Sequence, residues 1–483
     1  MMGKIDSILS DWEPVIGLEV HVQLNTQTKM FCGCSLVYGD DPNTHTCPTC
    51  LGLPGALPVV NEEAIALAIR LGLAFGGSIR EVCHFSRKNY FYPDLTKGYQ
   101  ISQFDEPIIE GGAVSFWHDG KETSINLTRI HLEEDAGKSI HSNGTDDTLL
   151  DFNRCGAPLI EIVSEPEMRH PSEARAYLQR IHQTVRFLEI SNANMEKGEL
   201  RCDANISLRK RGETILGTKT EMKNMNSFRY VEKALWYEIE RQGGVLNSGG
   251  DVKQCSLLWD EKNNKAEIMR TKEDAHDYRY FPEPDLVKLD LTNGLMKRVS
   301  KESWEVPSYA EKRLVSDGLS HKDATILASE KPILNYYDRV RSEGISSSNA
   351  GKWIIVEVLR LVKEKQKDID QLGLDPARLA ELILCVENGT LNAGTAKELL
   401  GRIGNDPRSL EEMIKEEGLL QVSDMDELGS AVKSVITDNS NEFERYQNGE
   451  KQLFGFFMGA TMKAMGGKSD PKLVKKILTE KLG

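Results

Sequence analysis

The chain has 483 residues and a mass of 54.1 kDa, which is long enough for about three domains and a sizeable core. It carries 60 Lys and Arg against 74 Asp and Glu, a net charge of −14, and 39% of its residues are hydrophobic. This composition excludes a small disulfide-stapled scaffold and a protein that coats nucleic acid nonspecifically, because phosphate binding requires clustered basic residues. Any contact with RNA is expected on a segregated basic surface.

Neither membrane insertion nor secretion is indicated. No apolar run reaches the roughly 18 residues of a membrane helix, and the first residues lack the pattern of a targeting sequence. Nine cysteines, an odd number, argue against a disulfide framework. We expect a cytoplasmic protein with no membrane contact.

The residue pattern changes along the chain and predicts three parts. Residues 1–292 combine alternating strands, Gly and Pro turns and a few capped helices, whereas residues 293–405 show helical patterns and residues 406–483 form a small helical tail. The predicted fold class is α+β: a β-rich α/β domain followed by an all-α helical domain and an α-helical tail.

The helices of the first part are predicted from their capping residues. The first starts at Asn61 and ends at Gly76–Gly77. Two more are expected at about 171–188 and at about 227–241, the last ending before Gly243–Gly244. We expect all three to cover a sheet.

The last part is polarised in charge. Residues 411–450 contain eleven acidic and three basic side chains, a net charge of −8, whereas residues 451–483 contain two acidic and seven basic, a net charge of +5. Asp470 and Pro471 should begin a helix whose apolar side faces inward. A solvated face is the ordinary explanation of the lysines left outside, but their clustering in an acidic chain favours contact with nucleic acid. The candidate tRNA-binding residues are Lys472, Lys475 and Lys476.

Four cysteines predict a metal site. Cys32 and Cys34 form a C-x-C pair, and Cys47 and Cys50 form a C-x-x-C pair after twelve intervening residues. Two such pairs converge tetrahedrally on one zinc ion, and four thiolates close its coordination sphere. We therefore predict a structural zinc knuckle at residues 32–50, with His45 as a spare ligand and four reduced cysteines without metal as the alternative.

Two strands are predicted to present polar side chains on one face. Residues 16–24 alternate strictly, so a strand there buries its apolar side chains and presents Glu19 and His21 together. Residues 200–208 repeat this pattern with Arg201 and Asp203. A sheet facing water would explain both.

Two further carboxylates point to a cation. Glu134 ends a strand-like run, and Glu161 lies inside an apolar strand, where an unpaired charge would cost several kcal/mol. Together with Glu19, His21 and Asp203 they form a candidate site for a hard cation. Oxygen-rich ligands with a single imidazole suit Mg²⁺ better than zinc, and Mg²⁺ usually serves phosphoryl chemistry.

Loops at 86–99, 217–224 and 270–285 are dense in cations and aromatic residues. This pattern fits a phosphate or nucleotide site, although a solvated surface loop is a common alternative. The glycine-rich phosphate loop, the dinucleotide turn, the hydrolase elbow and the zinc-protease helix are all absent from the sequence.

Seven motifs resemble those of a known family. They are GLEVHVQL (17–24), YFYPDLTKGYQISQ (90–103), HLEEDAGK (131–138), DFNRCGAPLIEIVSEP (151–166), LRCDANISL (200–208), GTKTEMKNMNSFRY (217–230) and TKEDAHDYRYFPEPDL (271–286). Over nearly its whole length the chain resembles the B subunit of the bacterial aspartyl/glutamyl-tRNA amidotransferases, and its tail is similar to the small tRNA-binding YqeY-type domain. The resemblance implies a cradle domain, a helical domain and a tail.

The resemblance also implies a function. The B subunit of this family is an ATP-dependent carbon–nitrogen ligase that phosphorylates the side-chain carboxylate of Glu on tRNA(Gln) or Asp on tRNA(Asn). Ammonia from the A subunit, a glutaminase, displaces the phosphate and yields Gln-tRNA(Gln) or Asn-tRNA(Asn); a C subunit completes the heterotrimer. The implied cofactors are ATP, Mg²⁺ and, in some members, Zn²⁺. The alternative is a noncatalytic, zinc-containing scaffold that binds misacylated tRNA.

Site residues follow from the same resemblance. The family's Mg²⁺ ligands fall on Glu19, His21, Glu134, Glu161 and Asp203, and its ammonia path places Lys88 and Lys97 at the kinase site. Independently of the family, we assign nucleotide contacts to Arg201, Lys219, Lys223 and Asn224.

Overall fold

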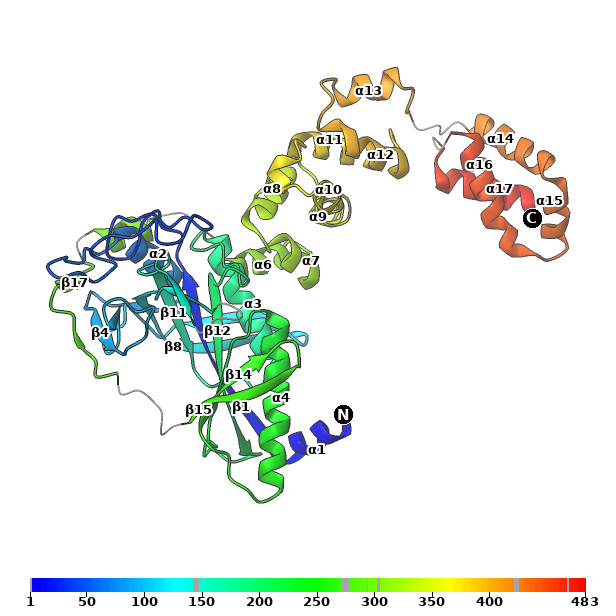
Figure 1. Ribbon diagram of the computed structural model, residues 1–483. Helices are drawn as coiled ribbons and strands as arrows, with labels where there is room; N and C mark the ends of the chain where they lie inside the picture. The colour runs from blue at the N-terminus through cyan, green and yellow to red at the C-terminus, as the bar shows by residue number, and fades with distance from the viewer. Residues whose placement is uncertain are drawn as a thin grey trace. The chain divides into compact units, whose positions relative to one another are not determined.

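The computed structural model describes residues 2–141, 147–271, 278–292, 294–301, 305–420, 425–466 and 469–483 (Figure 1). Residues 272–277 of the motif at 271–286, and residue 293 at the first predicted domain boundary, lie outside these ranges. The chain forms two compact units, Met1–Ser308 and Tyr309–Gly483. A β-rich unit with helices followed by an all-helical unit confirms the predicted fold class.

A mixed sheet of thirteen strands, counted over the described residues, forms the first unit. Its main path runs in the order β15, β14, β13, β12, β1, β11, β8, β5, β4, β16. The strand β1 therefore lies in the middle, and β11 and β12 both pair with it in antiparallel fashion (Figure 1). The bounds on this path are β1 (Trp12–Gln23), β4 (Ser86–Asn89), β5 (Tyr99–Ser102), β8 (Lys121–Glu134), β11 (Pro158–Ser164), β12 (Leu200–Lys210), β13 (Thr220–Lys223), β14 (Cys255–Asp260), β15 (Lys265–Thr271) and β16 (Phe281–Pro282).

Short strands extend this sheet or stand beside it. β2 (Ser78–Ile79), β6 (Ile109–Glu110) and β7 (Ala113–His118) branch from the path at β8, while β9 (Lys138–His141) pairs with β10 (Thr148–Asp151) and β3 (Val82–Cys83) with β17 (Leu289–Asp290). The two polar-faced strands predicted at 16–24 and 200–208 correspond to β1 and β12.

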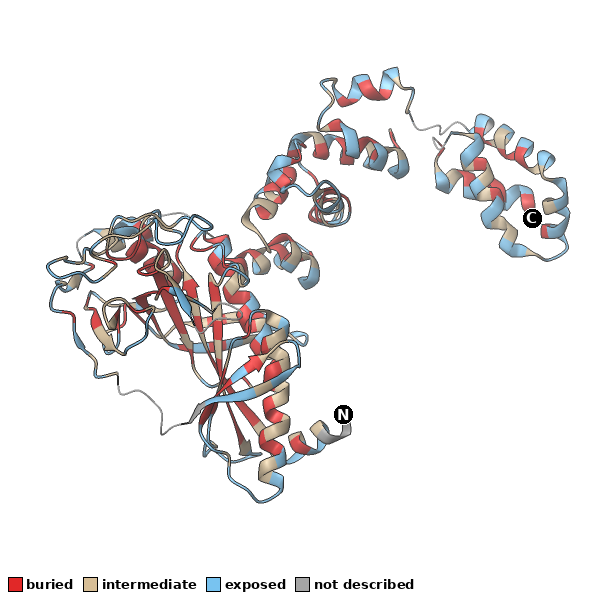
Figure 2. Ribbon diagram, viewed as in Figure 1, coloured by how far each residue is buried: buried red, intermediate tan, exposed pale blue. Residues whose placement is uncertain are grey.

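Helices cover the apolar face of the central strands. The helices are α1 (Met2–Asp11), α2 (Glu62–Ala74), α3 (Pro171–Phe187), α4 (Phe228–Asn247) and α5 (Leu295–Ser300). α3 contacts β1 and α4 contacts β12. Asn61 caps α2 by accepting hydrogen bonds from two backbone N–H groups, as its sequence position predicted. Figure 2 shows the buried residues concentrated along the central strands and on the helices beside them.

The predicted end of α4 was wrong. The helix continues through Gly243 and Gly244 to Asn247. α1 packs on α4 at this point, and a Cβ on Gly243 would lie 2.5 Å from the side chain of Ile8. Helix packing therefore outweighs the roughly 1 kcal/mol that each glycine costs a helix.

The second unit consists of helices. They are α6 (Pro307–Ser316), which begins just before the unit boundary, α7 (His321–Leu327), α8 (Lys331–Ser342), α9 (Ser347–Trp353), α10 (Leu359–Lys365), α11 (Pro376–Glu387), α12 (Ala393–Ile403), α13 (Leu410–Glu416), α14 (Met425–Asp438), α15 (Ser440–Gln447), α16 (Phe454–Ala464) and α17 (Pro471–Leu482). Residues 354–358 form a π-helical turn between α9 and α10, and short 3₁₀ turns lie at Ile369–Gln371 and Lys451–Leu453. None of the described helices is long and apolar enough to cross a membrane.

The tail has a core of its own. Val474, Ile477 and Leu478 of α17 are buried with Leu428 and Phe457. Asp470 caps α17 by accepting a hydrogen bond from the Lys472 backbone N–H at 2.7 Å, as predicted. The three candidate tRNA-binding lysines of α17 are exposed.

The predicted domain boundary at 405–406 lies in a segment that is hydrogen-bonded to the earlier helix α11. Arg378 on α11 donates hydrogen bonds to the carbonyl groups of Ile403, Asp406 and Arg408. The compact core of the tail is built from residues 428–482. The division at 405–406 therefore stays a prediction.

Candidate active site

The register of the central strands gathers polar residues on one face of the sheet. His21 on β1 pairs with Glu161 on β11 and with Arg201 on β12, and Glu19 pairs with Asp203. Directly opposed residues of antiparallel strands share a face, so these side chains lie together.

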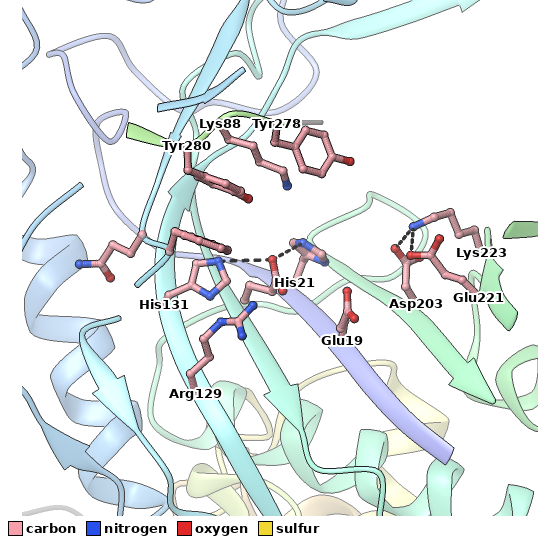
Figure 3. Close-up of a pocket in the computed structure, with 13 residues that line it drawn as sticks. Glu19, His21, Lys88, Arg129, His131, Asp203, Glu221, Lys223, Tyr278 and Tyr280 are labelled. Carbon is pink, nitrogen blue, oxygen red and sulfur yellow. Dashed lines mark hydrogen bonds and ion pairs between the residues drawn. The ribbon is translucent and has the colours of Figure 1, made fainter. Parts of the chain in front are cut away.

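All of them except Arg201 line a polar cavity of about 460 Å³ (Figure 3). Carboxylates, imidazoles and cations all face it, together with two tyrosines from the segment after residue 277. The lining residues are Glu19, His21, Lys88, Gln103, Phe104, Arg129, His131, Glu161, Asp203, Glu221, Lys223, Tyr278 and Tyr280.

His21 bridges two carboxylates. Its Nε2 lies 3.3 Å from Glu133 Oε1 and 3.3 Å from Glu161 Oε2, and ligand atoms of the three residues lie within 4.8 Å of one another. Burial disfavours the imidazolium, but the hydrogen bond to Glu161 and the charge of Glu133 outweigh it and raise the pKa of His21 to about 9. In turn, the charges and hydrogen bonds of His131 and His21 outweigh burial and hold the pKa of Glu161 well below its usual value.

Negative charge is in excess beside this cluster. Burial, and then the carboxylates of Glu161, Asp203 and Glu221, raise the pKa of Glu19. The only compensating hydrogen bond to Glu19 among the described residues comes from Asn205 at 2.8 Å. A divalent cation would relieve this repulsion, and His21 with the surrounding carboxylates is a donor set that fits Mg²⁺.

Two lysine side chains, those of Lys88 and Lys223, also line the cavity. Lys223 forms ion pairs with Asp203 and, at 2.9 Å, with Glu221. Lys88 Nζ lies 5.0 Å from the centre of the Tyr278 ring, and Figure 3 shows Lys88, Tyr278 and Tyr280 grouped across the cavity from Glu19. The cavity therefore offers ammonium groups for anions as well as carboxylates for a metal.

Not every predicted ligand lies here. Glu134 forms an ion pair with Lys97 and accepts a hydrogen bond from the Ile101 backbone N–H at 2.9 Å, outside the residues that line the cavity. Its neighbour Glu133, which the sequence analysis missed, is not a lining residue either, but its Oε1 lies 3.3 Å from His21 Nε2. Period-two alternation from His131 was the available signal, because it puts residues 131 and 133 on one face of β8.

The four residues predicted to contact the nucleotide do not all line the cavity either. Lys223 lines the cavity, whereas Arg201 donates to Asp135 at 2.8 Å and Lys219 is exposed before β13. Asn224 adopts a positive φ of 65° and donates to the Trp259 carbonyl at 3.2 Å, so it forms a turn at the end of β13.

The four cysteines of the zinc knuckle come together as predicted, with their sulfur atoms within 4.8 Å of one another. Beside them the fully buried Lys29 places its Nζ 3.6 Å from Cys50 Sγ and 2.7 Å from the His45 carbonyl. The hydrogen bond from Cys32 and the charge of Lys29 lower the pKa of the Cys50 thiol to about 4, against the effect of burial. A buried ammonium against a thiolate fits a Cys₄ zinc centre, while His45 pairs with Asp40 instead.

Two family models match most of the chain. A family model described as the GatB/GatE catalytic domain matches residues 14–297, and one described as the GatB domain matches residues 335–482.

Three relatives named as B subunits of aspartyl/glutamyl-tRNA(Asn/Gln) amidotransferases are similar over almost their whole length. The protein of Moorella thermoacetica is 45% identical over 98% of this chain and 100% of its own, that of Chlorobaculum tepidum 46% over 98% and 99%, and that of Prosthecochloris aestuarii 47% over 98% and 98%. The chain belongs to the family of B subunits of the aspartyl/glutamyl-tRNA(Asn/Gln) amidotransferases.

Proposed function

We propose that the cavity phosphorylates the side-chain carboxylate of Glu on tRNA(Gln) or Asp on tRNA(Asn) with ATP, and that ammonia then attacks the acyl carbon and displaces the phosphate to form the amide. The observation that carries this proposal is that His21 and Glu161 line one polar cavity with Lys88 and Lys223. Glu133 lies behind the lining residues, with its Oε1 3.3 Å from His21 Nε2. The names of the relatives supply the substrate class.

The chemistry needs an activated carboxylate. A carboxylate attacked by ammonia lacks a leaving group, and conversion to an acyl phosphate supplies one. When bound, Mg²⁺ offsets the charge that develops on the transferred phosphoryl group. His21, Glu133 and Glu161 would hold the ion, with Glu19 and Asp203 beside them.

The remaining polar residues have separate tasks in this proposal. Lys88 and Lys223 bind phosphate oxygens, while Tyr278 and Tyr280 exclude water from the cavity. Ammonia enters past the buried pair of Lys97 and Glu134 toward Lys88, as the family resemblance suggests. This polar, charged cavity favours catalysis over a noncatalytic scaffold.

The wider assembly is part of the same proposal. The A subunit would supply ammonia from glutamine and the C subunit would complete a heterotrimer, because the relatives are named as subunits. We assign residues 1–292 to the kinase cradle, 293–405 to a helical domain and 406–483 to a tail that binds tRNA in the cytoplasm through Lys472, Lys475 and Lys476. Zinc in the knuckle has a structural role.

The variant Glu161→Gln tests the proposal in the assembled complex. It keeps the shape of the side chain and removes the charge that His21 and His131 face, so ATP-dependent tRNA amidation should fall by about 100-fold or more while glutaminase activity remains. Glu165→Gln is the matched control, because Glu165 lies just beyond β11, outside the cavity, and accepts a hydrogen bond from Thr128 that an amide oxygen preserves. Unchanged amidation in Glu161→Gln would refute the proposal.

A further inference from the structure

The turn after the last zinc-binding cysteine packs directly on Lys97. Gly52 adopts a positive φ of 68°, and a Cβ at this position would lie 2.6 Å from Lys97 Cγ and 3.1 Å from Lys97 Cα. The lysine therefore lies against bare backbone, at a distance that only glycine permits.

The residue before Lys97 is bound to the same turn. Thr96 Oγ1 donates a hydrogen bond to the Cys50 carbonyl at 2.8 Å, and the Cys155 thiol donates to that carbonyl at 3.3 Å. The carbonyl group of a predicted zinc ligand thus holds the side chain of the residue before Lys97.

The carboxylate partner of Lys97 adjoins the same cysteine. A Cβ on Gly156 would lie in ordinary van der Waals contact with both residues, 3.6 Å from Cys50 Cβ and 3.9 Å from Glu134 Oε2, so both lie next to Gly156. Glu134 also accepts the Ile101 backbone N–H at 2.9 Å.

We infer that the zinc knuckle positions the ion pair of Lys97 and Glu134 beside the cavity, so that metal binding by the four cysteines determines the geometry of this pair. The side chains of Lys97 and Glu134 are only 10% and 3% exposed. A buried pair is stabilising only when its geometry is held closely, and the metal supplies rigidity that four free thiols lack. The inference rests on the proposed function only for its effect on amidation.

Two glycine variants of the full chain, in its assembled complex, test the positioning. Gly52→Ala places a methyl group against Lys97, whereas Gly55→Ala places one in open space at a similarly positive φ of 84°, so both variants share the backbone strain. Exchange of the Ile101 amide reports on Glu134 directly, because that amide donates to its carboxylate. We expect both variants to retain one zinc per chain and Gly52→Ala alone to accelerate Ile101 exchange about tenfold. Equal exchange rates in the two variants would overturn the inference.

Zinc removal provides a second measurement that needs no substitution. Chelation of the wild-type complex should accelerate exchange at Ile101 while the Val20 amide in central β1 stays protected. Thr96→Val, which lacks the hydroxyl bound to Cys50, should raise Ile101 exchange with zinc still bound. An Ile101 amide that stays protected after chelation would refute the coupling.

Amidation assays separate this inference from the proposed function. Suppose that the wild type and Gly55→Ala both amidate tRNA with ATP, and that Gly52→Ala has the same amidation rate and the same Ile101 exchange rate. In that case the positioning role fails and the proposed function stands. If the wild type does not amidate tRNA, the proposed function fails whatever the exchange data show.

Discussion

His21 and Glu161 face each other across the central strand pair, with His21 Nε2 3.3 Å from Glu161 Oε2. Glu133, from the neighbouring strand β8, lies at the same distance from the same nitrogen. One imidazole therefore joins carboxylates from two other strands, and the site exists only when all three strands are paired in register.

Glu133, rather than Glu134, should control cation binding. Glu133→Gln removes a carboxylate next to His21 and should weaken Mn²⁺ binding, measured by electron paramagnetic resonance of the free ion, by about 10–100-fold. Glu134→Gln is the adjacent control and should leave Mn²⁺ affinity nearly unchanged, because its partner is Lys97. The reverse order of effects would contradict the arrangement.

His182 should make the first unit less stable in acid. Burial between α3 and α4, and then the charge of Arg186, lower its pKa from 6.5 to about 4. The unfolded chain therefore binds a proton first as the pH falls, and the stabilisation present above pH 6.5 is lost between about pH 6.5 and 4. We expect a loss of about 2 kcal/mol, since the side chain is partly exposed.

Denaturant titrations of the wild type and of His182→Gln measure this loss. The variant lacks the titrating group, so its unfolding free energy should fall less than that of the wild type between pH 6.5 and 4. Parallel curves for the two proteins would show that His182 does not contribute.

Alanine substitutions at two adjacent glycines of α4 should change the stability of the protein in opposite directions. Gly243→Ala places a methyl group 2.5 Å from Ile8 and should destabilise the protein by about 1–2 kcal/mol. The methyl group of Gly244→Ala would lie in open space. This variant should stabilise the protein by about 0.5–1 kcal/mol, because alanine favours the helix more than glycine does. Thermal unfolding of the two variants measures the difference, and equal shifts would contradict the packing of α1 on α4.

The exposed lysines of α17 should contribute the electrostatic part of tRNA binding. Changing Lys472, Lys475 and Lys476 to Gln should weaken tRNA binding and reduce the slope of log affinity against log salt by about 2–3. Exposed Lys121, Lys253 and Lys262 of the first unit make a control triple with the same change in net charge. Equal effects of both triples would show that only net charge matters.

The sequence alone determined the features that depend on nearby residues. Helix starts at Asn61 and Asp470, strand alternation in β1 and β12, and the four-cysteine cluster were all predicted, because capping, period-two alternation and knuckle turns are set within a few residues. The family motifs extended this to the fold class and the family.

Tertiary structure decided which residues meet. Alternation predicts the faces of a strand but not its neighbours, so the choice between Glu133 and Glu134 depended on the pairing of β8 with β11. Packing of Ile8 on Gly243 kept α4 helical past its local stop signal. Likewise, Arg201 bonds to Asp135 although its position on β12 is beside His21. Such contacts join residues far apart in sequence, and their free energies arise only when the strands and helices are packed together.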